Sequence, residues 1–332
     1  MSRIVQFSEI GAPEVLKIVD ADVPAPKASE VRIRVKALGL NRAESMFRSG
    51  KYAEYPKFPA KLGYEAAGIV DAVGSGVTQF KVGDAVSVVP AFSLNQYGMY
   101  GELVLAPAHA VVKHPANLSF EEAAAIWMMY LTAYDALIGT AKLTKSDTVL
   151  IPAASSSVGI AAIQITNQVG AKPIALTRTS AKKEQLLKAG AAHVIVTDEQ
   201  EIVAEVARIT GGKGATVVYD PVGGPTFAKL VSASAPGARI ILYGALSPEP
   251  TTLPLLDMIF KRPIITGAMI MTTSGDPAAL KKGIEFVADG LKSGALKPII
   301  AKVFPFDQIV ESHRYLEANQ QFGKVVVSVG QG

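Results

Sequence analysis

Residues 148–169 contain a buried strand, a turn of very small residues and an apolar helix, in that order. The strand is expected over 148–152, the turn reads Ala-Ala-Ser-Ser-Ser, and the helix is expected over 157–169, before Gly170. This order places free backbone N–H groups and the positive end of a helix dipole at one point, which favours a bound phosphate. The glycine pattern of dinucleotide sites maps onto 154–159, where only the last glycine is present. On this segment alone, an ordinary N-capped strand-to-helix turn explains the sequence about as well.

Beyond this turn, apolar and β-branched segments of strand length alternate with segments of helix length. With 148–152, the expected strands are 174–177, 193–197, 216–220, 239–243 and 265–271. The helix-length stretches between them include 181–189, 199–209 and 226–235. Six strands alternating with helices predict a doubly wound α/β domain with a parallel sheet. Such sheets bind ligands at the carboxyl ends of their strands, where the serine turn would lie, so a bound nucleotide becomes the favoured interpretation.

The end of the second expected strand indicates which nucleotide. NAD sites usually place an acid here to accept from the ribose 2′-hydroxyl. This chain has Thr177, Arg178 and Thr179, then Lys182, and no acid before Glu184. The two cations would pair with a 2′-phosphate, and the threonine hydroxyls would add hydrogen bonds. The predicted cofactor is therefore NADPH; the alternative is that these cations are solvated surface groups, as most are.

The composition limits the class of protein. At 332 residues the chain can form two domains with sizeable cores, and no apolar run reaches the length of a membrane span. Residues 1–13 lack the apolar core of a signal peptide, so we expect a cytoplasmic protein. The net charge of +4 comes from 33 basic and 29 acidic residues without charge blocks, which gives no indication of nucleic-acid binding.

The chain has no cysteine, which excludes disulfides, a cysteine nucleophile and a thiolate zinc site. Of its four histidines, His109 and His114 are five residues apart in an apparently extended segment, so they cannot form a helical i, i+4 metal pair. His193 and His313 are isolated in the sequence. We therefore predict no metal site.

The N-terminal part has a different pattern, with short strand-like segments at 2–7, 15–20, 30–40, 66–73, 84–89 and 101–105. Gly, Pro and charged turns separate them, which predicts an irregular β-barrel or folded sheet. Ser119 and Glu122 then form a capping box that opens an apolar helix to about residue 138, expected to be buried between the domains. After Pro298 the pattern returns to strand and turn. We expect one domain from 1–124 and 272–332, and a second from 125–271.

Several short motifs are spread over the whole chain, namely those at 39–44, 48–52, 63–68, 80–84, 131–134, 243–244 and 323–326, together with the serine turn. With these motifs the chain resembles the zinc-independent, quinone oxidoreductase-like (zeta-crystallin-like) branch of the medium-chain dehydrogenase/reductase superfamily. The resemblance implies a GroES-like catalytic domain, a Rossmann cofactor domain and a cleft between the two, in agreement with the pattern of strands and helices.

The chain departs from the zinc alcohol dehydrogenases of that superfamily at the zinc ligands. It has Leu40 or Asn41 where those enzymes have cysteine, and Tyr64 where they have histidine; their structural-zinc lobe of four cysteines is absent. Without zinc, a simple alcohol would lack both a lowered pKa and an electrophile for its oxyanion. Reduction of an activated acceptor is easier, because conjugation spreads the charge that arrives with the hydride. Quinones and α,β-unsaturated carbonyls fit this requirement.

An acceptor of this kind needs a hydrogen-bond donor at its developing oxyanion, and the candidates are Asn41, Tyr52 and Tyr64. Tyr52, by its spacing from Asn41, matches the tyrosine that protonates the product in zinc-free enoyl-thioester reductases. Each has a structural alternative: Tyr52 as a lid residue, Tyr64 as a core aromatic, and Asn41 as a residue that holds the loop. The predicted cofactor-binding residues are Thr132, Ser155, Ser156, Ser157, Val158, Gly159, Thr177, Arg178, Thr179, Lys182, Gly244, Gly323 and Lys324.

The resulting hypothesis is an NADPH-dependent reductase of quinones or enones that transfers hydride without a metal. One alternative is an enoyl-thioester reductase of lipid or polyketide metabolism, although no cationic track for a pantetheine arm is visible. Another is an NADPH-binding sensor or structural protein with little turnover. We also expect a homodimer, because the apolar segment 264–271 would form a sheet edge that invites association.

Overall fold

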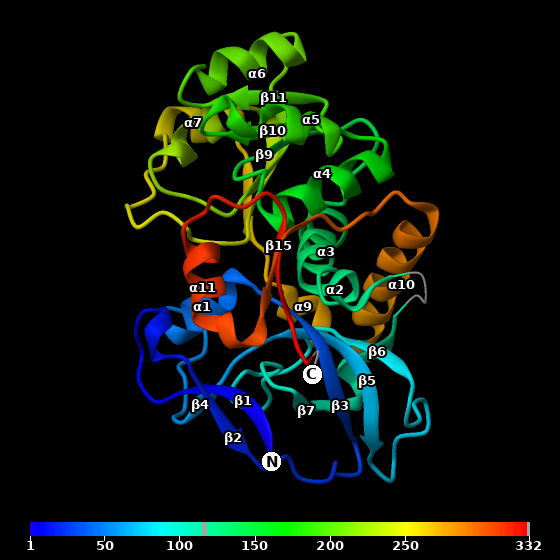
Figure 1. Cartoon of the computed structure of the whole chain (residues 1–332). Helices are drawn as coiled ribbons and strands as arrows, with labels where there is room; N and C mark the ends of the chain where they lie inside the picture. The colour runs from blue at the N-terminus through cyan, green and yellow to red at the C-terminus, as the bar shows by residue number, and fades with distance from the viewer. Residues whose placement is uncertain (115–117, 331–332) are drawn as a thin grey trace. The chain divides into compact units, whose positions relative to one another are not determined.

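The computed structural model describes residues 1–114 and 118–330, and the chain divides into two compact units (Figure 1). Unit 1 comprises Met1–Met128 and Pro298–Gly332, and unit 2 comprises Met129–Lys297. Short helical turns occur in both: η1 (Pro13–Val15), η2 (Ala108–Ala110), η4 (Ser180–Lys182), η5 (Phe306–Gln308) and a π-helical turn, η3 (Asp135–Thr140). No helix in the described ranges is long and apolar enough to cross a membrane.

Unit 2 is built on a six-stranded parallel sheet with the order β11-β10-β9-β12-β13-β14. Its strands are β9 (Thr148–Ile151), β10 (Lys172–Thr177), β11 (His193–Val196), β12 (Ala215–Asp220), β13 (Ser234–Leu242) and β14 (Ile264–Gly267). Its helices are α4 (Ser157–Val169), α5 (Lys183–Lys188), α6 (Ile202–Thr210), α7 (Thr226–Ala233), α8 (Leu255–Lys261), α9 (Ile270–Ser274) and α10 (Pro277–Ser293). The strand order reverses beside β9, which confirms the predicted doubly wound sheet and places the end of β9 at its switch point.

Unit 1 contains two sheets. Strands β1 (Ser2–Phe7), β2 (Lys17–Ala21) and β4 (Ala60–Lys61) form the smaller. The larger has the order β15-β16-β3-β5-β6-β8, with β7 also paired to β3. Its strands are β3 (Glu30–Gly39), β5 (Glu65–Val73), β6 (Ala85–Val88), β7 (Leu103–Pro107), β8 (Val111–Lys113), β15 (Ile300–Pro305) and β16 (Lys324–Ser328). Helices α1 (Arg42–Arg48), α2 (Phe120–Ala123) and α11 (Ile309–Glu317) also lie in this unit. The C-terminal segment joins the sheet directly, since β16 pairs with β3.

Three sequence expectations differ from the structure. The last strand of unit 2 ends at Gly267 instead of residue 271, and α9 follows it. The reason is that β14 pairs only with residues 239–242 of β13, so it has no ladder partner beyond Gly267. The second domain boundary lies at Lys297, not at residue 271, because α10 packs inside unit 2. Gly283 of α10 lies so close to Leu131 that a Cβ would be 2.9 Å from its Cδ2.

The third difference is a break in the helix expected from Ser119 to residue 138. The capping box forms as predicted, because the Ser119 hydroxyl accepts from Glu122 N and the Glu122 carboxylate accepts from Ser119 N. However, α2 ends at Ala123, and a new helix, α3 (Trp127–Tyr134), begins after a short connection. The N–H of Met128 donates to the Glu65 carboxylate, at 3.0 Å. A side chain from β5 thus supplies an acceptor where a continuous helix would use the Ala124 carbonyl.

Candidate active site

Two of the three predicted donors, Tyr52 and Tyr64, meet in unit 1. Tyr64 lies just before β5 and follows Gly63, which has φ +104° and passes so close to Tyr100 that a Cβ would lie 2.4 Å from its ring. This close approach requires glycine. The Tyr64 hydroxyl donates to the Tyr52 hydroxyl at 3.4 Å, and the two ring centroids are 6.3 Å apart. Tyr64 is buried and Tyr52 is partly exposed, so Tyr52 presents the pair to solvent.

The surroundings of this pair keep both phenols protonated. Phe47 contacts the Tyr52 ring and Phe92 contacts the Tyr64 ring, at centroid distances of 6.5 and 5.8 Å. Burial raises the pKa of both tyrosines above its usual value. A phenol that remains neutral keeps its proton available for donation. The pair therefore offers a hydrogen-bond donor, not a phenolate base, at neutral pH.

The loop that carries Tyr52 is tied to the segment around Asn95. The Asn95 side chain donates to the Tyr55 carbonyl at 3.0 Å and accepts from the backbone N–H of Lys57 at 2.8 Å. The Ser93 hydroxyl also donates to the Glu54 carboxylate. These contacts hold the part of the loop that follows Tyr52, which limits the positions that Tyr52 can adopt.

Asn41, the third predicted donor, has its amide fully engaged inside unit 1. Its Oδ1 accepts from Lys324 Nζ at 2.6 Å, and its Nδ2 donates to Glu65 Oε1 at 3.0 Å. The same Nδ2 also lies 3.3 Å from acceptors on Gly39 and Glu44. An amide with these contacts has no hydrogen left for a ligand without breaking one of them. This arrangement favours the alternative in which Asn41, as the N-cap of α1, holds the loop.

The sequence predicts that Gly323 and Lys324 bind the cofactor. In the structure, both residues also have a structural role within unit 1. Lys324 is fully buried, and its ammonium forms an ion pair with Glu65 in addition to its contact with Asn41. Gly323 has φ +101°, and a Cβ there would lie 2.2 Å from the Ile299 carbonyl oxygen, so glycine is required by the turn into β16. The Lys324 ammonium therefore has two protein partners, and its contact with the cofactor stays a prediction.

Glu44 is buried in the same unit as Glu65, and the sequence analysis did not identify it as a site residue. It lies in α1 and accepts from the Tyr100 hydroxyl at 2.5 Å, and from the backbone N–H groups of Tyr64 and Asn41, each at 2.8 Å. Burial raises its pKa, while these donors oppose that rise. With only donors around it, the carboxylate form is the one that the contacts stabilise. The position of Glu44, three residues after the N-cap Asn41, indicates a capping box. It does not indicate the contacts with Tyr64 and Tyr100.

In unit 2 the serine turn has the features of a phosphate site. Ser156 caps α4, because its hydroxyl accepts from Gly159 N at 3.0 Å. A Cβ at Gly159 would lie 2.7 Å from the Ala153 carbonyl oxygen, so glycine allows the close approach of the helix to the turn. Residues 155–158, at the N-terminus of α4, are partly exposed. Ala153 has φ +48°, a left-handed conformation that the sequence did not indicate.

Arg178 and Lys182 lie at the end of the neighbouring strand, β10. Arg178 is exposed, and the Lys182 ammonium donates to the Ser155 hydroxyl at 3.3 Å. Burial and the nearby Arg178 charge lower the pKa of Lys182. Thr177 is partly exposed and Thr179 is exposed beside them. Two mutually repelling cations next to a helix N-terminus form a site suited to a phosphate.

The two remaining predicted cofactor residues in unit 2 are accessible. Thr132 is partly exposed on α3, although its neighbours Leu131 and Ala133 are buried. Gly244 is exposed after β13, and a Cβ there would lie 2.8 Å from the Pro221 carbonyl oxygen. Gly244 therefore has a conformational reason to be glycine in addition to its predicted contact.

The histidines lie in separate environments. His109 contacts the Ala91 carbonyl through Nε2, at 2.9 Å, and His193 is exposed at the start of β11. His313 is fully buried against Tyr100, and burial lowers its pKa to about 3. Within residues 1–114 and 118–330, no cluster of three or more His, Asp or Glu side chains is arranged to hold a metal ion.

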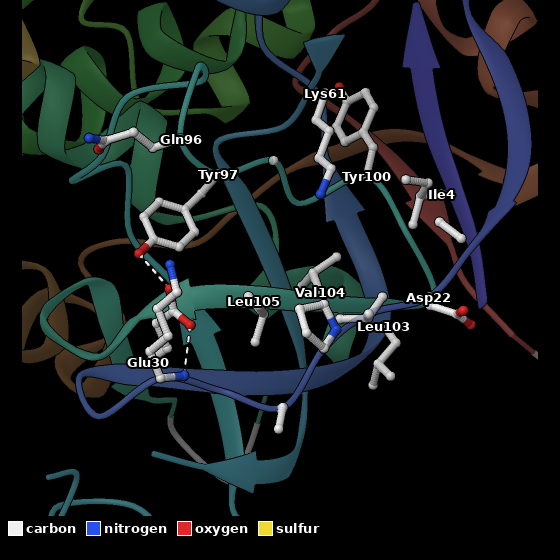
Figure 2. A pocket seen from close by; sticks show the side chains of 16 residues that line it. Ile4, Asp22, Glu30, Lys61, Gln96, Tyr97, Tyr100, Leu103, Val104 and Leu105 are labelled. Carbon is white, nitrogen blue, oxygen red and sulfur yellow. Dashed lines mark hydrogen bonds between the residues drawn. The ribbon is translucent and has the colours of Figure 1, made fainter. Parts of the chain in front are cut away.

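A separate pocket of about 490 Å³ lies in unit 1 (Figure 2). Figure 2 shows Tyr97 on one side, with its hydroxyl donating to Glu30 at 3.0 Å, and the strand residues Leu103, Val104 and Leu105 along the floor. None of the predicted catalytic or cofactor residues lines it. It therefore does not correspond to the predicted site.

Comparison with known proteins places this architecture in a family. Residues 27–116 match the alcohol dehydrogenase GroES-like domain, and residues 157–289 match the zinc-binding dehydrogenase domain. Human quinone oxidoreductase is 32% identical over 334 residues, covering 98% of each chain.

Solved structures agree with this. An NAD-dependent alcohol dehydrogenase superimposes with a TM-score of 0.90 at 34% identity, over 99% of this chain and 100% of the other. The Escherichia coli quinone oxidoreductase complexed with NADPH gives 0.89 at 30% identity, over 98% and 99%. The CurK enoyl reductase gives 0.88 at 26% identity, over 99% of each chain. The chain belongs to the medium-chain dehydrogenase/reductase superfamily and is a homologue of its quinone oxidoreductases.

Proposed function

We propose that this protein is an NADPH-dependent reductase that transfers hydride to quinones or α,β-unsaturated carbonyls without a metal ion. The observation that carries the proposal is the Tyr52–Tyr64 pair, a neutral hydroxyl donor in a ring of aromatic side chains. Such a donor suits an acceptor whose oxygen becomes negative as hydride arrives. The quinone oxidoreductase relatives support the same class of reaction.

The residues of unit 2 fit NADPH. The capped N-terminus of α4 would hold the pyrophosphate, and Arg178 with Lys182 would hold the 2′-phosphate. The relatives include both an NAD-dependent alcohol dehydrogenase and a quinone oxidoreductase complexed with NADPH, so they do not decide between the cofactors. The absence of an acid between Thr177 and Glu184 favours NADPH for this chain.

When bound, NADPH supplies the hydride, and the protein's own residues manage the proton. Tyr64 donates to the oxygen of Tyr52, which leaves the Tyr52 proton free to point at the acceptor. For an enone, Tyr52 would donate to the enolate oxygen or protonate the enolate carbon. For a quinone, water can supply both protons, because the aromatic product needs no carbon protonation. Tyr64 thereby orients Tyr52 and sharpens its preference for donation.

The metal-free part of the proposal rests on the side chains present. The chain has no cysteine, and the position at which zinc-dependent relatives have a histidine is the phenol Tyr64. The Lys324 ammonium also sits between Asn41 and Glu65, where a second cation would be repelled. We expect activity to survive prolonged chelator treatment, with no stoichiometric zinc by elemental analysis. One tightly held zinc per chain would refute this part.

The direct test is NADPH oxidation with a panel of quinones, enones and crotonyl thioesters. Turnover with quinones and enones supports the proposal. A preference for thioesters would favour the enoyl-thioester reductase alternative, which the similarity to CurK enoyl reductase keeps open. Tight NADPH binding without turnover of any acceptor would indicate a sensor or structural protein instead.

We also propose a homodimer formed through the β14 edge of unit 2. The helix before that edge, α8, exposes four large apolar side chains on one face: Leu255, Leu256, Ile259 and Phe260 are 65–77% exposed. Ile264 of β14 is 61% exposed beside them. Several exposed apolar side chains close in sequence to a sheet edge are typical of a protein–protein interface.

A further inference from the structure

The carboxylate of Glu65 is a junction between segments that are far apart in the sequence. It is fully buried at the start of β5, forms an ion pair with Lys324, and accepts from Asn41 Nδ2 and from Met128 N, each at 3.0 Å. Oε1 takes the Asn41 and Lys324 contacts, and Oε2 takes the Met128 contact. Each oxygen therefore has a separate task.

Gly39 makes room for this junction. A Cβ at residue 39 would lie 2.7 Å from Glu65 Oε1 and 2.0 Å from the Ala124 carbonyl oxygen. Gly39 is paired with Glu65 across β3 and β5, and with Val326 across β3 and β16. Three strands and the α2–α3 connection thus converge on one carboxylate.

Two of the three partners of Glu65, Asn41 and Met128, begin segments that carry a proposed site residue. Asn41 is the N-cap of α1, and the loop after α1 carries Tyr52. Met128 is the second residue of α3, and Thr132 follows it by four residues, on the same face of the helix. The Glu65 carboxylate therefore fixes the start of the segment before Tyr52 and the start of the helix that carries Thr132.

We propose that Glu65 is a positioning residue for the reaction, with Lys324 as its counter-ion. It ties the segment before Tyr52, through Asn41, to the backbone N–H of Met128 at the start of α3. This inference rests on the proposed reductase function, in which Tyr52 is the proton donor. A displacement of about 1 Å between reacting groups can cost on the order of a hundredfold in rate.

A purely stabilising role makes a different prediction. A buried ion pair can often be replaced by apolar residues without loss of stability, because the desolvation of both charges disappears with them. If Glu65 and Lys324 served only stability, a folded apolar replacement would keep full activity. If Glu65 positions, the apolar replacement should fold and still lose rate, because Asn41 and Met128 lose their common acceptor.

The test compares two double variants that both remove the charges. Glu65→Leu/Lys324→Met removes every hydrogen bond of the junction. Glu65→Gln/Lys324→Met retains an oxygen for Met128 N and replaces Oε1 by an amide N–H, which Asn41 Oδ1 accepts once the Asn41 amide turns over. We expect the Leu variant to lose about 10–100-fold in kcat, with the Kd for NADPH changed less than about threefold. The Gln variant should recover to within about threefold of the unmodified protein. If the Leu variant does not fold, Glu65→Met/Lys324→Leu replaces it, since Met adapts to irregular cavities.

Trp127 supplies a readout that needs no turnover. It is the only tryptophan of the chain, it is 2% exposed, and it is the first residue of α3. Its emission should shift in the Leu variant and be restored in the Gln variant. The matched control, Asp71→Asn/Arg32→Met, removes an ion pair that also involves β5 and should leave both readouts unchanged.

Three results would overturn the proposal: full kcat in the apolar variant, equal losses in both double variants, or an unchanged Trp127 signal in the apolar variant. If the unmodified protein does not oxidise NADPH with any acceptor of the panel, the proposed function is refuted independently of the role of Glu65. The Trp127 comparison then decides whether Glu65 positions α3, so the two failures remain distinguishable.

Discussion

The Glu65 junction of unit 1 and the Arg178 corner of unit 2 use charge in opposite ways. The Arg178 corner comprises Arg178, Lys182 and the serine turn at 153–157. In the junction, Glu65 and Lys324 are fully buried and neutralise each other. In the corner, Arg178 is exposed and Lys182 is only partly buried, and burial and the Arg178 charge lower the pKa of Lys182. The junction therefore pairs an anion with a cation inside the protein, whereas the corner places two cations close together.

This difference separates positioning residues from ligand-binding residues. A network whose donors and acceptors are all used by the protein can hold segments in place but offers little to a ligand. A cluster of like charges beside a capped helix start becomes more favourable when an anion binds. By this criterion Asn41 and Lys324 belong to the first class, and Arg178 to the second. Tyr52 lies between the two, because it accepts from Tyr64 but keeps its own proton.

The largest expected effect comes from removing that proton. Tyr52→Phe should lower kcat for an enone by about a hundredfold or more, the usual scale for losing one general acid or oxyanion donor. The effect on a quinone should be smaller, and NADPH binding should be unchanged. Side-by-side turnover of an enone and a quinone measures the difference.

Tyr55→Phe is the matched control, since Tyr55 lies on the same loop with 61% of its surface exposed. It should retain the activity of the unmodified protein. Because burial raises the Tyr52 pKa, its proton should be retained to a higher pH than that of a free tyrosine. The alkaline loss of enone activity should therefore begin above the usual tyrosine pKa of about 10. Full turnover of every acceptor by the Phe variant would remove Tyr52 from the mechanism.

Arg178→Ala tests the other side of the comparison. It should weaken NADPH binding by about tenfold to a hundredfold, because it removes a charge-assisted contact worth about 1.5–3 kcal/mol. NADH affinity should change little, so the cofactor preference should shrink. Titration of both cofactors against the unmodified protein and the variant measures this.

Lys188→Ala removes an exposed cation from the end of α5, the helix that follows Arg178 and Lys182, and should leave both affinities unchanged. It therefore controls for a general loss of positive charge. Equal losses of NADPH and NADH affinity in the Arg178 variant would contradict a 2′-phosphate contact, as would an NADH preference in the unmodified protein.

The sequence predicted best those features whose signals are local. The capping box at Ser119, the bounds of α4 and the strand at 2–7 all agree with the structure, because caps and hydrophobic periodicity act over a few residues. The six-stranded sheet followed from the same signals. The corner at Arg178 could also be anticipated, since it lies directly after a strand.

The Glu65 junction could not be predicted in this way. The partners of Glu65 are 24, 63 and 259 residues away in the sequence, and only the tertiary fold brings them together. The same contact breaks the helix expected from 119 to 138. The one visible signal was an acid directly before the apolar run from Ala66 to Val70, which marks a buried charge without identifying its partners.

The apolar side chains that α8 exposes to water should also have a binding partner. For α8 we expect a second copy, so Phe260→Asp should raise the dimer dissociation constant at least about tenfold, on the scale of an interface hot spot. Light scattering at micromolar concentration should then show the 34.9 kDa monomer. Leu187→Asp, at an apolar residue that is 45% exposed on α5, should leave the dimer intact. A monomeric unmodified protein would refute the interface.

The smallest expected effect is a change in stability from a substitution at Ala153, in the turn before α4. Ala153 has φ +48°, which costs a non-glycine residue about 1–2 kcal/mol, whereas glycine adopts it without that cost. Glycine also makes the unfolded chain more flexible, which opposes the gain by about 0.4–1 kcal/mol. Ala153→Gly should therefore stabilise the protein by up to about 1 kcal/mol, measured as a rise in Tm, with NADPH affinity unchanged. Ala154→Gly, at a buried neighbour without a positive φ, should lower Tm. If both variants lose stability equally, the strain at Ala153 has no energetic consequence, and the turn is held by its contacts instead.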